Sequence, residues 1–278
     1  MLRFHTLDET PAELPGPGAL VPTMGTLHEG HCALIRSARE IAGPKGSVLV
    51  SIFVNPLQFD RPSDLAAYPR DFEADLALCE KLGVDGAFLP DPVAFYAADH
   101  SVTVSESLLS RHLCGATRPG HFDGVCTVVL KLINLLRPAH VLFGKKDFQQ
   151  LAIIRRLVRD LALPVEIHGV ETVREADGLA LSSRNANLTP EHRADAPRIR
   201  RALLAARDLA INGEQRTDAY LDTARHHLLE NAPEGLKIDY LELVDRDSLQ
   251  LLPKATVPAL LATAVYYGDV RWIDNVEI

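Results

Sequence analysis

Short apolar runs alternate with longer segments of helical period over the first 170 residues of this chain. The apolar runs, rich in Val, Ile and Phe, lie at residues 19–22, 48–54, 87–90, 139–143 and 165–170. The helical segments between them lie at residues 32–42, 72–82, 124–137 and 148–161. Such alternation is typical of strands in a parallel sheet buried on both faces by helices. We therefore predict an α/β fold with a Rossmann-like, doubly wound parallel sheet.

The alternation stops after residue 170. Thr189 followed by Pro190 is a typical helix start, with a hydroxyl cap and proline at the first helical position. We predict amphipathic helices at residues 190–211 and 218–231, and strands at residues 238–244, 257–267 and 270–273. This pattern predicts a Rossmann-like domain at residues 1–174 and a smaller α+β domain at residues 175–278.

Charge and cysteine content exclude several classes of protein. The formal net charge of −8 opposes long-range attraction to nucleic acid or anionic membranes. It does not exclude a phosphate ligand, because a cation about 4 Å away gains about 4 kcal/mol at an effective dielectric of about 20. The four cysteines form no C-x-x-C pair, which favours reduced thiols over a disulfide framework or a zinc site. The N-terminal residues lack the pattern of a secretory signal, so we expect a cytoplasmic protein with no membrane association.

The strongest motif is the string Pro-Thr-Met-Gly-Thr-Leu-His-Glu-Gly-His at residues 22–31, where a predicted strand ends and a helix begins. Ligands of open α/β sheets bind at the carboxyl ends of strands, and a helix start offers unpaired N–H groups. His28 and His31 are three residues apart and share one helix face, with Gly30 leaving room for a ligand. Two surface histidines or a metal-binding pair are the alternatives, but the position after a strand and a glycine turn favours a nucleotide phosphate.

The H-x-G-H string resembles the signature of the nucleotidyl-transferase superfamily. Within that superfamily the longer string resembles pantothenate synthetases, the pantoate:beta-alanine ligases. The resemblance extends along the chain, to blocks at residues 51–59, 118–125, 144–150, 174–185 and 272–275. Thr26, Phe148, Leu181 and Trp272 depart from the commonest family pattern, and none of these changes removes a polar group assigned to chemistry.

The resemblance implies an ATP-dependent condensation of (R)-pantoate with beta-alanine to pantothenate, AMP and pyrophosphate, through a pantoyl adenylate. The implied catalytic residues are His28, His31, Lys146 and Arg184. Mg²⁺ is expected to bind mainly through the ATP phosphates, and the family suggests a homodimer formed through the N-terminal domain. Cys32 begins an apolar helix face and is not expected to act as a nucleophile.

The resemblance also implies two sets of binding residues. The ATP-binding set is Pro22, Met24, Gly25, Thr26, Leu27, His28, Glu29, Gly30, His31, Gly144, Lys145, Lys146, Asp147, Val173, Leu181, Ser182, Ser183 and Arg184. The substrate-binding set is Asn55, Gln58, His121 and Gln150.

The residue types fit these roles. Amides after a strand can read hydroxyl and carboxylate groups, although ordinary turn caps are the alternative for Asn55 and Gln58. Lys146 follows a predicted strand and Gly144, so its ammonium can reach a phosphate at the same sheet edge. Ser182, Ser183 and Arg184 can clamp a triphosphate, and a polar interdomain loop is their alternative.

Two other functions share parts of this pattern. A cytidylyl- or adenylyl-transferase would share His28 and His31 but would form no AMP. A non-catalytic nucleotide-binding module on the same fold would need no paired amides beside the phosphate site. The full set of Lys146, Gln58, Gln150 and Arg184 therefore argues against it. A tRNA synthetase is disfavoured by the acidic charge and by the lack of an anticodon-reading domain.

Overall fold

The computed structural model describes residues 1–6, 9, 18–255 and 258–278, and these form two compact units. Unit 1 comprises Met1–Glu106, Pro119–Lys145 and Ile153–Glu171. Unit 2 comprises Ser107–Arg118, Lys146–Ala152 and Thr172–Ile278. The units are interleaved along the chain, and the predicted domain boundary between residues 174 and 175 stays a prediction.

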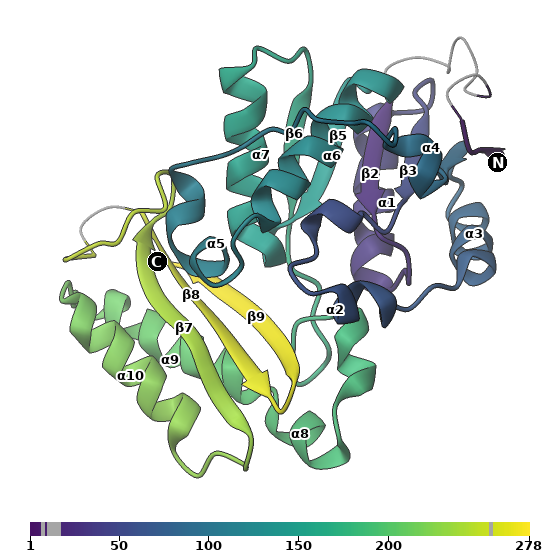
Figure 1. Ribbon diagram of the computed structural model, residues 1–278. Coiled ribbons are helices and arrows are strands. Elements are labelled where there is room, and N and C mark those ends of the chain that lie inside the picture. The colour runs from purple at the N-terminus through teal and green to yellow at the C-terminus, as the bar shows by residue number, and fades with distance from the viewer. Residues whose placement is uncertain (7–8, 10–17, 256–257) are drawn as a thin grey trace. The chain divides into compact units, whose positions relative to one another are not determined.

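A six-stranded sheet forms the centre of unit 1 (Figure 1), and each strand is parallel to its neighbours. In their order across the sheet, the strands are β1 (Leu2–Phe4), β4 (Gly86–Phe88), β3 (Val48–Ile52), β2 (Ala19–Thr23), β5 (His140–Gly144) and β6 (Glu166–Val170). This sheet confirms the predicted doubly wound α/β class. Strand β1 is an addition, because its three residues are too short a run to show a period.

The strand order reverses between β2 and β5. From β2 the chain passes to β3 and β4 on one side, and it later returns to place β5 on the other side of β2. The middle strands are buried on both faces, so they are almost wholly apolar, as in Val48–Ile52, where all five residues are buried and only Ser51 is polar. In folds of this kind, ligands bind at the carboxyl ends of the strands beside such a reversal.

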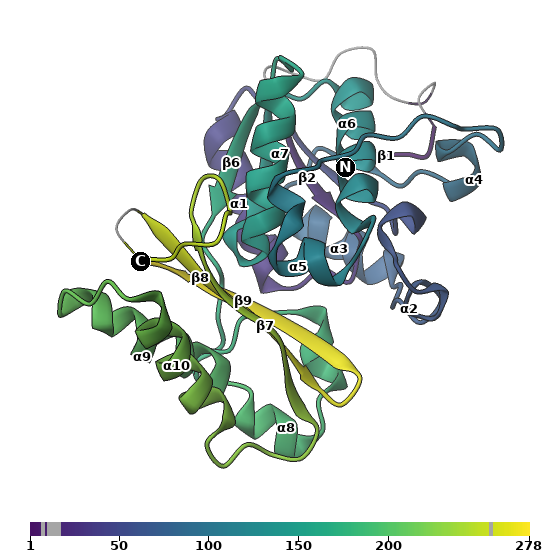
Figure 2. The same cartoon turned by 60° about the vertical axis from the view of Figure 1, so that its left-hand side comes forward.

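The helices of unit 1 cover both faces of this sheet. They are α1 (Glu29–Ala42), α2 (Pro62–Ala66), α3 (Phe72–Lys81), α4 (Pro92–Phe95), α6 (His121–Leu136) and the part of α7 (Phe148–Asp160) from residue 153 onward. Ile35 and Ala38 of α1 pack with Cys79 of α3 and Val50 of β3 in one core cluster. Right-handed crossovers place α1 and α3 on one face and α6 on the other, as Figure 2 shows for α1 and α6.

Unit 2 is built on a three-stranded antiparallel sheet in the order β7 (Leu236–Asp245), β8 (Ala259–Tyr267) and β9 (Val270–Glu277). Its helices are α5 (Leu113–Thr117), α8 (Pro190–Asp195), α9 (Arg198–Ile211) and α10 (Thr217–Leu229). Leu203 of α9 and Tyr220 of α10 pack against Leu243 and Val265 of the sheet. This arrangement confirms the predicted smaller α+β part.

Two details of unit 2 differ from the prediction. The single helix predicted at residues 190–211 is wrong: α8 ends at Asp195, and α9 begins at Arg198. Pro197 lies at the break, and a continuous helix cannot pass through it because proline lacks the N–H that the helix needs.

Strand β9 runs four residues beyond its predicted end, since β8 pairs with it as far as Glu277. Residue 257, the predicted start of the middle strand, lies outside the described residues.

No helix within the described ranges is long and apolar enough to cross a membrane.

Candidate functional site

The loop between β2 and α1 is fixed by a buried carboxylate. Asp75 of α3 is only 3% exposed. Its Oδ2 accepts the backbone N–H of Thr26 at 2.8 Å, and its Oδ1 accepts that of Leu27 at 2.6 Å. Thr26 has a φ of 55°, an uncommon backbone conformation for a residue other than glycine. The carboxylate therefore holds the predicted ATP-binding loop in a shape that Thr26 alone would not favour.

Backbone hydrogen bonds fix the imidazole rings of His28 and His31 at the start of α1. The backbone N–H of His28 donates to Nδ1 of His31 at 3.2 Å, and the N–H of Gly30 donates to Nδ1 of His28 at 3.1 Å. The two ring centroids are 4.2 Å apart. Because each Nδ1 accepts a hydrogen bond, the neutral rings carry their proton on Nε2. Both imidazoles are therefore set to act as Nε2–H donors at a helix N-terminus, where the dipole favours an anion.

Gly30 makes room for the ring of His28. A Cβ atom at position 30 would lie 2.9 Å from Cε1 and 3.0 Å from Nδ1 of that ring. Such a contact would push the imidazole out of its position, so the glycine in the H-x-G-H string is required by the His28 conformation itself.

Gln58 is oriented by the buried residue Asn55. Asn55 is 1% exposed, and its Nδ2 donates both to Oε1 of Gln58 at 3.0 Å and to the carbonyl of Gly124 at 3.1 Å. Its Oδ1 accepts the Tyr96 hydroxyl at 2.9 Å. The amide of Gln58 consequently points its Nε2 toward Met24 of the motif loop, with the sulfur 3.2 Å away. Asn55 acts here as a positioning residue, and its direct contact with a substrate stays a prediction.

His121, the first residue of α6, supports the same short turn, η1 (Pro56–Gln58). Its Nδ1 is 2.8 Å from the backbone carbonyl of Gln58, so Nδ1 is the donor. Helix α6 approaches the turn closely, since a Cβ at Gly124 would lie 2.3 Å from the carbonyl oxygen of Leu57. Three predicted substrate residues, Asn55, Gln58 and His121, thus form one hydrogen-bonded group in unit 1.

Lys146 belongs to unit 2 and follows directly after Gly144 and Lys145. Its side chain is 18% exposed, and its Nζ lies 3.6 Å from Oδ2 of Asp147. The amide of Asn275 on β9 donates to the backbone carbonyl of Lys146 at 3.0 Å. Lys145 instead forms an ion pair with Glu171, and both of these residues belong to unit 1.

The Ser-Ser-Arg stretch lies in a short helical turn, η4 (Ser183–Asn187), in unit 2. Oγ of Ser182 accepts the backbone N–H of Arg184 at 3.2 Å, and the Arg184 side chain is exposed. Asn185 anchors the turn, because its Oδ1 accepts the indole N–H of Trp272 at 3.0 Å and its Nδ2 donates to Glu175 at 2.9 Å.

Val173 and Leu181 begin and end a small hairpin that precedes this turn. The backbone N–H of Leu181 donates to the carbonyl of Val173 at 3.0 Å. Arg174, beside them, makes a bidentate ion pair with Asp274, which is 4% exposed, at 2.7 and 2.8 Å. Residues 272–275 therefore anchor three segments of unit 2. Asp274 holds the hairpin, Trp272 holds the Ser-Ser-Arg turn, and Asn275 holds the turn that carries Lys146.

The predicted site residues divide between the two units. Residues 22–31, Asn55, Gln58, His121, Gly144 and Lys145 lie in unit 1; Lys146, Asp147, Gln150, Val173, Leu181, Ser182, Ser183 and Arg184 lie in unit 2. Gln150 lies in α7 and is partly buried. Cys32 is 3% exposed, and burial raises the pKa of its thiol, with the Glu29 carboxylate raising it further. The role of each residue toward ATP or substrate stays a prediction.

The sequence interpretation missed two positioning residues. Asp75 received no role from the sequence, and the structure places it on the buried face of α3. Asn275 was recognised as part of a motif without a role. The helical phase that Asp75 shares with the buried Leu76 and Cys79 could have indicated a buried carboxylate, but not the N–H groups that it binds.

The fold and the histidine pair define a class of protein. A parallel sheet whose strand order reverses at β2, with an H-x-G-H string opening the next helix, is a nucleotide-binding α/β arrangement. Comparison with known proteins identifies the family within this class. The family model described as pantoate-beta-alanine ligase matches residues 8–277, and the chain belongs to this family.

Individual relatives agree with that assignment. The pantothenate synthetase of Akkermansia muciniphila is 55% identical over 262 residues, which cover 93% of this chain and 91% of the relative. That of Solidesulfovibrio magneticus is 52% identical over 255 residues, which cover 92% of this chain and 88% of the relative.

Solved structures show the same fold. The pantothenate synthetase of Thermus thermophilus matches with a TM-score of 0.92 and 43% identity, over 99% of both chains. The pantoate-beta-alanine ligase of Francisella tularensis, solved in complex with beta-gamma ATP and beta-alanine, matches with a TM-score of 0.78 and 30% identity, over 99% of this chain and 97% of that one.

Proposed function

We propose that this chain catalyses the ATP-dependent condensation of (R)-pantoate with beta-alanine, forming pantothenate, AMP and pyrophosphate through a pantoyl adenylate. The observation that carries the proposal is the pair of imidazole rings, His28 and His31, that backbone hydrogen bonds fix at the start of α1 in a chain of the pantoate-beta-alanine ligase family. The ATP and beta-alanine bound to the Francisella tularensis relative support the same two substrates.

The first step activates a carboxylate. A carboxylate and an amine do not condense in neutral water, so an oxygen of the pantoate carboxylate attacks the alpha phosphorus of ATP. A new phosphorus–oxygen bond forms, and the bond to pyrophosphate breaks. Negative charge grows on the phosphoryl oxygens during this step. The Nε2–H groups of His28 and His31 are set to donate to such oxygens, and the N-terminal N–H groups of α1 add to them.

Lys146 and Arg184 supply positive charge for the phosphates in this proposal. Lys146 is the more constrained of the two, since Asn275 holds its backbone and its side chain is mostly buried. Arg184 is exposed on a turn whose backbone is anchored, which suits a side chain that must release pyrophosphate after the first step.

Mg²⁺ is proposed to bind at this site together with ATP. Mg²⁺ prefers oxygen ligands, whereas His28, His31, Lys146 and Arg184 offer N–H donors. Both oxygens of Asp75 already accept backbone N–H groups. An ion held mainly through the ATP phosphates would neutralise part of their charge.

Gln58 is proposed to bind pantoate. Its amide is fixed by Asn55 with Nε2 directed toward the motif loop, so an N–H can donate to a pantoate oxygen. Gln150 is proposed as a second amide for the same substrate, and His121 supports the Gln58 backbone from the side. Amides that are already oriented bind a polar substrate with little loss of side-chain freedom.

The second step forms the amide. The free amine of beta-alanine attacks the acyl carbon of the adenylate, a carbon–nitrogen bond forms, and the carbon–oxygen bond to AMP breaks. The amine passes its surplus proton to water, and His31 is proposed to donate a hydrogen bond to the departing phosphate. Positioning and charge stabilisation carry this chemistry without a nucleophilic side chain. We also propose a homodimer, which the family resemblance supports, and a cytoplasmic location.

A product assay tests the proposal. Purified protein is supplied with MgATP, pantoate and labelled beta-alanine, and the products are separated. Equal amounts of pantothenate and AMP are expected. Pyrophosphate without AMP would indicate a nucleotidyl-transferase, and bound but unchanged ATP would indicate a binding module; either result overturns the proposal. Gln58→Ala should raise the KM for pantoate more than that for ATP, whereas Gln250→Ala, a change at an amide that caps Ser248 in unit 2, should alter neither.

A further inference from the structure

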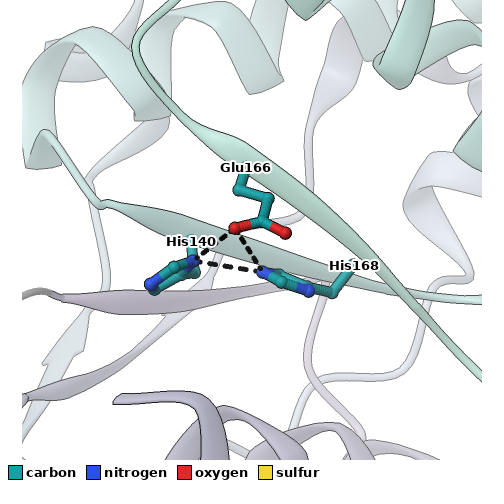
Figure 3. A group of neighbouring side chains, drawn as sticks. All are labelled: His140, Glu166 and His168. Atoms are coloured by element: carbon teal, nitrogen blue, oxygen red, sulfur yellow. Dashed lines mark hydrogen bonds and ion pairs between the residues drawn. The ribbon is translucent and has the colours of Figure 1, made fainter.

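Two histidines and a glutamate gather on neighbouring strands at the edge of the unit 1 sheet (Figure 3). His140 begins β5, and Glu166 and His168 belong to the edge strand β6. His140 is the direct register partner of Glu166. Glu166 and His168 are two residues apart on one strand, so they share a face of the sheet. The three side chains are thus brought together by backbone pairing and not by a loop.

The three potential ligand atoms have the spacing of a metal site. Nδ1 of His140 is 3.1 Å from Nε2 of His168. Oε2 of Glu166 is 3.6 Å from Nδ1 of His140 and 3.8 Å from Nε2 of His168. Ligand atoms placed tetrahedrally at about 2.0–2.1 Å from a zinc ion lie about 3.3 Å from one another. Only small side-chain rotations therefore separate the observed arrangement from a coordinated one.

We propose that His140, Glu166 and His168 form a site for a divalent transition-metal ion, with Zn²⁺ as the ion that the donor set suits best. Two imidazoles and one carboxylate favour Zn²⁺ over Mg²⁺ or Ca²⁺, which prefer oxygen ligands. Three protein ligands leave a fourth tetrahedral position for water. The ion would join edge strand β6 to β5, so its role is to stabilise this edge of the sheet.

The facing ring nitrogens of His140 and His168 are placed to become metal ligands. A metal binds the neutral imidazole through an unprotonated ring nitrogen. In the metal-free state Nδ1 of His140 and Nε2 of His168 form a hydrogen bond, so one of these two nitrogens carries a proton. Metal binding requires that proton to move to the far nitrogen of one ring, and Glu166 then neutralises part of the ion's charge.

This site is separate from the one proposed for ATP. His140 and Glu166 are the first residues of their strands, whereas the H-x-G-H helix follows the carboxyl end of β2 in the same parallel sheet. None of the three residues belongs to the proposed catalytic or binding machinery. The proposal therefore does not rest on the proposed function, and the two can fail independently.

Zinc titration of the metal-free protein tests the proposal. Zinc chloride is titrated calorimetrically into the full-length wild-type chain and into His140→Gln, His168→Gln and Glu166→Gln variants. We expect one site in the wild type and an affinity at least about tenfold weaker in each variant, because each loses one ligand. His226→Gln is the matched control: His226 also faces a glutamate, Glu230, at 3.4 Å, and its loss should leave zinc binding unchanged.

Two further measurements make the result decisive. Crystals soaked in zinc should show an anomalous peak about 2.0–2.2 Å from the three ligand atoms, and a peak only at His28 and His31 would overturn the proposal. Unchanged zinc affinity in all three variants would overturn the proposal as well, and so would a wild-type dissociation constant above about 1 mM. The three residues would then be a cluster of cross-strand ion pairs without a metal. Glu166 has a largely exposed side chain, so Glu166→Gln is expected to fold, and an unchanged circular-dichroism spectrum without zinc verifies the folding of every variant.

Discussion

The side-chain amide of Asn275 donates a hydrogen bond to the backbone carbonyl of Lys146, 129 residues earlier in the chain. Asn275 lies near the end of β9, a strand fixed along its length by pairing with β8. The turn that carries the proposed catalytic lysine is therefore held by a rigid element and not by its own short sequence. Side chains supported in this way keep their geometry as charge changes during a reaction.

Removing this hydrogen bond should displace the turn that carries Lys146 and lower kcat. A neutral hydrogen bond contributes about 0.5–1.5 kcal/mol, so Asn275→Ala should lower kcat by about two- to tenfold. Steady-state kinetics with saturating substrates measure this change. Asn212→Ala is the control, since Asn212 also donates to a backbone carbonyl in unit 2, at the end of α9. Equal kcat values for both variants would show that the lysine turn needs no support from β9.

Asp75→Asn should destabilise the protein and weaken ATP binding together. The asparagine keeps one acceptor oxygen but turns an NH₂ group toward the N–H of Thr26 or Leu27. We expect a loss of about 2 kcal/mol in the free energy of unfolding, because a charged, buried acceptor is lost, and a higher KM for ATP. Urea unfolding and initial rates measure both. Asp71→Asn is matched in chemistry and caps the same helix, where asparagine serves as well as aspartate; an equal loss in that control would contradict the role given to Asp75.

The histidine pair should be needed for the first half-reaction. His28→Ala and His31→Ala should each slow adenylate formation by about 10² or more, as expected for the loss of a donor to a developing charge. Gln in place of His31 retains an N–H near the position of Nε2, so it should recover part of the rate. Quenched-flow measurement of the pantoyl adenylate that forms gives these rates. Near-wild-type rates in both alanine variants would refute the assignment.

The cysteines should be unreactive in the folded protein. All four are free and buried, and burial raises the pKa values of Cys79 and Cys126 to about 12. A raised pKa keeps the thiol protonated below it, so at pH 8 only about one such group in ten thousand is a thiolate. A thiol-specific disulfide reagent at pH 8 should release colour only after denaturation. Rapid labelling of Cys79 or Cys126 in native protein would show that these sites open to solvent.

The strand and helix alternation predicted the architecture of unit 1 because fully buried strands and amphipathic helices have distinct periods. The same reasoning failed at Pro197, where a continuous apolar period hid a break that the proline itself should have indicated. Strand β1 was not predicted because three residues cannot show a period.

The site was predictable only in part. His28, Gly30 and His31 lie within one short string, so sequence spacing is enough to place them together. The partners of Leu27 and Lys146 are Asp75 and Asn275, which are separated from them by 48 and 129 residues. Contacts over such separations depend on how strands and helices pair, and a single sequence carries no spacing that reports them.

The most direct test of the two-step mechanism is the exchange of labelled pyrophosphate into ATP without beta-alanine. If pantoyl adenylate forms first, enzyme with pantoate, MgATP and labelled pyrophosphate should return label to ATP, and the exchange should require pantoate. Replacing Lys146 or Arg184 by alanine should raise its barrier by about 2 to 4 kcal/mol, as for other preorganised donors. Exchange without pantoate would indicate an adenylated side chain. Enzyme that makes pantothenate without any exchange would contradict the adenylate route.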